Sequence, residues 1–186
     1  MGDAFDHIPP RHRDFIAAQH LFFVASAPSG ADGRVNLSPK GLDSLRVLDP
    51  HTVAYLDFVG SGVETIAHLR ENGRIVLMFC AFEGPPNIVR LHGRGEVVEP
   101  GHARFGELRA HFPPFESARA VILVRVERSS DSCGYGVPRY AYEGERSALP
   151  AWAAKKGGEG LAQYQREKNA ASIDGLPGLA WVQKAR

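Results

Sequence analysis

The sequence predicts a mainly β protein, a small barrel with flanking helices. About six segments combine apolar and β-branched residues over strand-like lengths, with turn residues between them. One short helical pattern interrupts these segments midway, whereas a doubly wound parallel sheet needs a crossover helix after most strands. Hydrophobic residues make up 44% and charged residues 23% of 186 residues, which is typical of a globular chain of one domain. We therefore expect a single domain over residues 1–186.

The first half of the chain carries the start of this sheet. Its predicted elements are a helix over residues 13–19 and strands over 20–27, 34–38, 45–48 and 52–58. Glycine and proline between residues 28 and 33 predict that the first two strands form a hairpin. The pair Asp49 and Pro50 predicts a turn before the fourth strand.

A short helix follows this strand. Apolar residues recur at helical spacing between residues 63 and 70. Ser61 and Glu64 have the spacing of a capping box, in which the two side chains bind the first backbone N–H groups. Asn72 and Gly73 tolerate left-handed backbone angles and predict the end of the helix.

The second half supplies the remaining strands and a helical tail. Its predicted elements are strands over residues 74–82, 87–99 and 119–128, a helix over 100–111, and two helices between 150 and 172. Two glycines at 93 and 95 inside a strand predict a bend or bulge. Gly157 and Gly158 predict the break between the two tail helices.

Charge and composition exclude several classes of protein. The chain has 22 Lys and Arg against 21 Asp and Glu, a net charge of +1, so no basic excess points to nucleic acid. The longest apolar run, residues 75–82, is too short to span a membrane, and the first ten residues lack a secretory pattern. Cys80 and Cys133 cannot form a disulfide framework, which favours a cytoplasmic protein. The eight histidines lack ligand spacing, so we expect no metal.

The junction between the strand over 52–58 and the helix is the first candidate site. A helix N-terminus offers unpaired N–H donors and partial positive charge, which suits a phosphate. Gly60 and Gly62 allow close approach of the backbone, and the hydroxyls of Ser61 and Thr65 can also donate. The alternative, which the local pattern favours, is that Ser61 only caps the helix.

A second candidate cluster lies at residues 36–41. Asn36 and Ser38 share one face of a strand, and Lys40 is expected in the following loop as a mobile cation. The alternative is an ordinary strand end with a solvated lysine. Arg90 lies inside a strong strand, where it is either exposed or paired with an anion.

The order of these segments resembles the pyridoxamine 5′-phosphate oxidase-like, FMN-binding split-barrel superfamily. The resemblance is carried by residues 34–41, 52–58, 60–65, 68–74 and 90–95. It covers about residues 15–130, which form the expected barrel core, and leaves 131–186 as a C-terminal loop and helical extension. The tail segments 131–138 and 168–178 resemble a subgroup whose substrates are mostly unassigned.

The resemblance implies a six-stranded antiparallel split barrel and a homodimer with FMN in a cleft at the subunit interface. It places the flavin against residues 34–40 and the phosphate at residues 61–65. The implied cofactor-binding residues are Asn36, Leu37, Ser38, Lys40, Asp57, Ser61, Gly62, Thr65 and Arg90. Lys40 and Arg90 would balance the phosphate charge, and Asn36, Ser38 and Asp57 would lie along the ribityl chain or ring edge.

Departures from the namesake oxidase bear on the substrate. Gly62 and Val63 stand where the oxidase has Arg and Lys, and Ile88 stands where it has a flavin-contacting Gln. The tail also lacks the Trp- and Arg-bearing segment that closes the oxidase site. These differences argue against pyridoxamine 5′-phosphate and favour an oxidoreductase acting on another small molecule. Three alternatives remain: a deazaflavin-dependent reductase, a flavin or haem binder without turnover, and a barrel that binds no cofactor.

Overall fold

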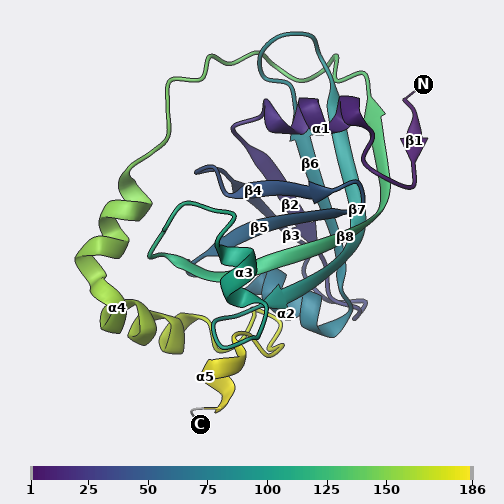
Figure 1. Cartoon of the computed structure of the whole chain (residues 1–186). Coiled ribbons are helices and arrows are strands. Elements are labelled where there is room, and N and C mark those ends of the chain that lie inside the picture. The colour runs from purple at the N-terminus through teal and green to yellow at the C-terminus, as the bar shows by residue number, and fades with distance from the viewer. Residues whose placement is uncertain (1, 185–186) are drawn as a thin grey trace.

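One antiparallel sheet organises the computed structural model, which describes residues 2–184. The strands are β1 (Ala4–Phe5), β2 (Phe22–Ser26), β3 (Asn36–Lys40), β4 (Leu45–Asp49), β5 (Thr52–Phe58), β6 (Arg74–Cys80), β7 (Ile88–Val98) and β8 (Ala118–Ser132). The helices are α1 (Pro10–Ala17), α2 (Glu64–Glu71), α3 (Phe105–Arg109), α4 (Ala148–Lys168) and α5 (Ala180–Lys184). The sheet curves around the core, while α4 and α5 lie to one side and below it (Figure 1).

The strand order is β3-β2-β6-β7-β8-β5-β4, with β1 added to β8. This order confirms a mainly antiparallel β fold with flanking helices. It does not confirm the expected six-stranded barrel, because the described residues form eight strands and the path ends at β3 and β4. The hairpin of β2 and β3 has the predicted pairing, with Val24 opposite Ser38.

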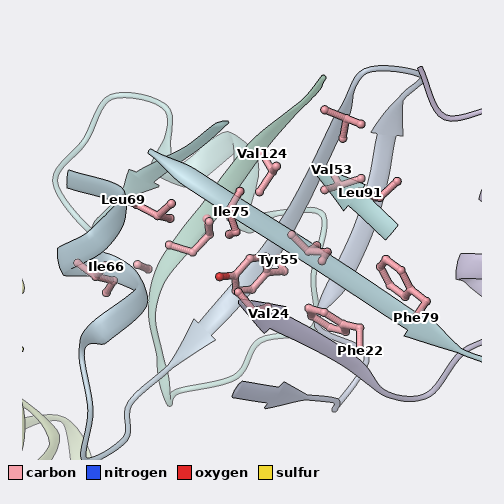
Figure 2. Close-up of a cluster of buried hydrophobic side chains, with 14 of the residues drawn as sticks. Phe22, Val24, Val53, Tyr55, Ile66, Leu69, Ile75, Phe79, Leu91 and Val124 are labelled. Atoms are coloured by element: carbon pink, nitrogen blue, oxygen red, sulfur yellow. The ribbon is translucent and has the colours of Figure 1, made fainter. Parts of the chain in front are cut away.

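Alternating side chains on β5 build two cores from one strand. Val53 and Tyr55 face the main core, where Tyr55 packs among Phe22 and Val24 (Figure 2). Leu56 faces the opposite side and packs in a second cluster with residues of α3. Because side chains of a strand alternate between faces, both surfaces of β5 become buried.

The predicted irregularity in β7 is confirmed. The register of β7 against β8 shifts between His92 and Gly93. A Cβ atom on Gly93 would lie 2.1 Å from the Arg125 backbone oxygen, so only glycine allows the two strands to approach this closely.

The sequence predicts where the helices end better than where they start. Gly73, at φ +72°, follows the end of α2, and Gly157, at φ 65°, breaks α4, both as predicted. The expected helix over 100–111 shortens to α3. The capping box is wrong: Val63 is the N-cap of α2, and no side chain caps it.

A buried polar cluster, which we call the N-terminal lock, fastens α1 to the sheet. His12 is 1% exposed; its Nδ1 lies 2.6 Å from Ser129 Oγ, and its Nε2 lies 3.0 Å from Asp131 Oδ2. Arg11, also on α1, forms an ion pair with the same Asp131 carboxylate. The lock lies at the α1 end of the molecule, whereas α2 and α5 lie at the opposite end (Figure 1). Among residues 2–184, every helix is too short or too polar to cross a lipid bilayer.

Candidate functional site

The inner face of β3 carries three of the predicted site residues. Asn36, Ser38 and Lys40 lie on alternate positions and are each half-buried. Their face is the one that continues into the core, because Ser38 pairs with fully buried Val24. Leu37 points to the opposite face and is 63% exposed, so the structure separates its side chain from the other three.

Lys40 belongs to an ion cluster instead of a mobile loop, which corrects the expectation from sequence. Its Nζ donates to Asp57 Oδ1 at 2.9 Å, and Arg119 Nε donates to Asp57 Oδ2 at 2.7 Å. Asp57 is 1% exposed, and the Lys40 and Arg119 side chains are 15% and 6% exposed. We call these three residues the Asp57 cluster.

The Asp57 cluster keeps one positive charge in excess. Burial alone would raise the pKa of Asp57, but the charges of Arg119 and Lys40 outweigh burial and lower the pKa from 3.8 to about 2. Asp57 is therefore ionised at neutral pH, and two cations face one carboxylate. Arg119 Nη1 is buried and has no hydrogen-bond partner within residues 2–184. The cluster is thus electrostatically suited to a nearby anion.

Arg119 is the member that the sequence analysis missed. The β5–β8 register shifts between Asp57 and Phe58, whose partners on β8 are Ala120 and Ala118. Arg119 lies between these two partners, where a bulge re-aims the side chain. The signal in the sequence is an arginine at the start of an apolar strand.

The start of α2 is joined to β3 by a side-chain hydrogen bond. Asn36 Nδ2 donates to Thr65 Oγ1 at 3.0 Å, so these predicted residues do come together. Ser61 and Gly62 are exposed, and a Cβ on Gly62 would have no atom closer than 3.9 Å. No side chain caps α2, so its first N–H groups have no side-chain partner within the described residues. The loop fits an anionic group by this test.

Arg90 does not join these residues within one chain. Paired residues of neighbouring strands share a sheet face, and Arg90 lies opposite Met78, which lies opposite Phe23. Lys40 instead pairs with buried Phe22 on the inner face. Arg90 is therefore on the outer face, where its Nη1 donates to Ser132 Oγ at 3.1 Å.

A cavity of about 570 Å³ opens at the Lys40 end of β3. It begins at Gly41 and reaches buried Ser44, whose hydroxyl has no partner within the described chain. His20 and Tyr142, whose rings stack at 3.6 Å, also line it. This volume is within the usual range of small-molecule pockets.

The C-terminal extension reaches the loop before α2, a contact the sequence did not indicate. Asn169 Nδ2 donates to the Gly60 carbonyl at 2.9 Å. The Glu64 carboxylate accepts a hydrogen bond from the Ile173 backbone N–H at 3.1 Å. Because this carboxylate is engaged by the extension, Glu64 does not cap α2. Cys80 is buried and Cys133 is exposed. No group of three or more His, Cys, Asp or Glu within residues 2–184 is arranged to hold a metal ion.

Comparison with known proteins identifies the family. The family model described as pyridoxamine 5′-phosphate oxidase matches residues 8–133, which span most of the sheet. A pyridoxamine 5′-phosphate oxidase family protein of Aspergillus flavus, ustO, is 40% identical over 94% of this chain and 77% of its own length. The chain therefore belongs to the pyridoxamine 5′-phosphate oxidase-like split-barrel superfamily, as the sequence indicated.

Solved structures agree with this fold. Crystal structures of HupZ from Group A Streptococcus share 25% and 26% sequence identity with this chain, each with a TM-score of 0.52. They cover 73% and 67% of this chain and 99% of their own.

Proposed function

We propose that the protein is a homodimeric FMN-binding flavoprotein and an oxidoreductase acting on a small molecule other than pyridoxamine 5′-phosphate. The observation that carries this proposal is the uncapped start of α2 beside an inner strand face that ends in a cationic cluster. Membership of the family supports a flavin as the ligand. It also supports a six-stranded split-barrel core, near residues 15–130, within the eight-stranded sheet.

The residues of β3 would order the cofactor from one end to the other. Asn36 contacts Thr65, so the phosphate would be held at this end by Ser61, Gly62 and Thr65. Lys40 is four residues further along the strand, about 13 Å away. The Asp57 cluster would therefore face the other end of the cofactor, and Lys40 would not balance the phosphate charge as the resemblance implies. Ser38 lies between, where its hydroxyl already donates to Asn36 Oδ1 at 3.2 Å.

The chemistry would come from the flavin, which carries hydride and single-electron transfer when bound. The protein would bind the phosphate, orient the ring with β3 and exclude water with the core behind it. β3 ends the sheet path, so its free edge leaves backbone groups for a ligand. The cavity that begins at Gly41 is where we place the small-molecule substrate.

The homodimer would give Arg90 a role that a single chain does not. Its outer sheet face carries half-buried Met78 and Ile88 beside the arginine, and Arg90 has a serine hydroxyl as its partner. A second copy covering this face would bring Arg90 toward the cofactor bound by the other subunit. Sedimentation of the purified chain, with and without FMN, tests the oligomeric state.

Binding of FMN is tested first by the absorbance spectrum of the purified protein and then by titration. The variant T65V keeps the shape of the side chain but removes the hydroxyl, and we expect about a tenfold weaker affinity for FMN. The exposed Ser29 provides a matched control, since S29A also removes one hydroxyl and should leave the affinity unchanged. A colourless protein that binds no added FMN would refute the proposal.

A further inference from the structure

We propose that Asn169, in the C-terminal extension, is a positioning residue that shapes the Gly60–Gly62 loop for the cofactor phosphate. The inference rests on the proposed function, because it assigns a role toward the same loop. Asn169 lies beyond residues 8–133, which the family model matches. It contacts the loop and not the ligand, so its role is to set the direction of loop peptides.

The contact is direct, and the asparagine that makes it is fully buried. Asn169 is 0% exposed, and its Nδ2 donates to the Gly60 carbonyl at 2.9 Å. The same Nδ2 approaches the Gly62 carbonyl at 3.5 Å, which is a weaker interaction. Asn169 Oδ1 is buried without a partner within residues 2–184. A buried oxygen without a hydrogen-bond partner costs free energy. The Nδ2 donor is therefore the group through which Asn169 acts on the loop.

The direction of the carbonyl determines the direction of the N–H groups. A trans peptide points its C=O and N–H to opposite sides, and residues 2–184 contain no cis peptide bond. A Gly60 carbonyl held toward Asn169 therefore turns the Ser61 N–H away from the extension. A Gly62 carbonyl turned the same way would do this for the Val63 N–H. The Ser61 N–H lies in the loop before α2, and the Val63 N–H lies at the uncapped N-cap residue of the helix.

The backbone of Asn169 is itself fixed. Its N–H donates to the Gln165 carbonyl at 2.8 Å, and its carbonyl accepts from the Leu179 N–H at 3.0 Å. A Cβ on Gly178 would lie 2.2 Å from this carbonyl, so the returning chain packs tightly against it. The segment between them also binds α2 through Ile173 and Glu64. Figure 1 shows this segment and α5 at the base of the molecule, near α2.

The test compares two ligands that differ only in the phosphate. FMN and riboflavin are titrated against the wild type and N169A, and the ratio of the two dissociation constants is measured. We expect N169A to lower the preference for FMN about fivefold to tenfold, the loss of one hydrogen bond to the loop. Riboflavin affinity should change by less than about threefold. The ³¹P resonance of bound FMN should also shift in N169A.

A second buried side chain separates positioning from general destabilisation. H12A removes His12 of the N-terminal lock, which also fastens a terminal segment but lies on α1, at the opposite end of the molecule from α2. It should lower the melting temperature and leave the FMN-to-riboflavin ratio unchanged. If N169A does not fold, N169L, which removes the donor and fills the space of the amide, is judged by the same ratio.

The two proposals fail in different ways. A wild type that binds neither ligand, or binds both equally, overturns the proposed function. A wild type that prefers FMN, with a preference unchanged in a folded Asn169 variant, overturns the positioning role alone. A ratio lowered equally by H12A would also overturn that role, because the effect would then follow stability.

Discussion

The Asp57 cluster and the N-terminal lock are both buried polar groups, yet they differ in charge and in completeness. In the Asp57 cluster two cations hold one carboxylate, and Arg119 Nη1 is left without a partner among the described residues. In the N-terminal lock both ring nitrogens of His12 have partners, Ser129 and Asp131. A satisfied cluster needs no ligand, whereas a charged and incomplete one costs stability unless an anion lies near. The comparison supports the proposal that a ligand binds beside the Asp57 cluster, whereas the N-terminal lock fastens α1 to the sheet.

The largest expected effect comes from removing the carboxylate between the two cations. D57N leaves the buried ammonium of Lys40 and guanidinium of Arg119 without their counter-charge. Breaking a buried ion pair on one side costs about 3–5 kcal/mol, so the free energy of unfolding should fall by that amount. Urea unfolding at pH 7 measures it.

The matched control for this substitution is D32N, which makes the same change at an exposed loop residue. It should alter the free energy of unfolding by less than about 0.5 kcal/mol. If D57N lowered the free energy of unfolding as little as D32N, the Asp57 cluster would not depend on its buried carboxylate, and the comparison would fail.

Acid should weaken the Asp57 cluster with a defined sign. The pKa of Asp57 is about 2 in the folded protein and near its ordinary 3.8 when unfolded, so the ionised carboxylate stabilises the fold above about pH 4. That contribution is lost as the pH falls toward 2. The difference in unfolding free energy between wild type and D57N should shrink by roughly 2 kcal/mol from pH 6 to pH 2.

Urea unfolding of both proteins across this range gives the difference directly. Asp131 also has a lowered pKa, through its hydrogen bond to His12, but it is present in both proteins and cancels. A difference that stays constant with pH would contradict the assigned direction for Asp57.

The same two regions show what the sequence could predict. Local patterns predicted the hairpin of β2 and β3, the irregularity at Gly93 and the break at Gly157, because each depends on neighbouring residues. The family resemblance predicts that β3 and the start of α2 form the site, and that role stays a prediction. The contact of Asn36 with Thr65 does join these two elements.

The remaining features of the site depend on contacts between residues that are far apart in the sequence. Arg119 meets Asp57 across 62 residues of chain, through a bulge whose register no local pattern reveals. Asn169 reaches Gly60 from 109 residues away and Ile173 takes up Glu64, so the capping box that local spacing predicts does not form. Arg90 lies on the face opposite to Lys40, which follows from strand pairing and not from strand propensity.

The smallest expected effect tests the N-terminal lock. S129A removes the hydroxyl 2.6 Å from His12 Nδ1, where Ser129 is 0% exposed. One lost buried hydrogen bond should lower the free energy of unfolding by about 1 kcal/mol, since Asp131 still holds the other ring nitrogen. Affinity for FMN should not change, because the N-terminal lock and the loop before α2 are fastened by separate parts of the chain. Thermal unfolding and FMN titration of the same sample measure both quantities, and a fall in affinity without a fall in stability would show that the two regions are coupled after all.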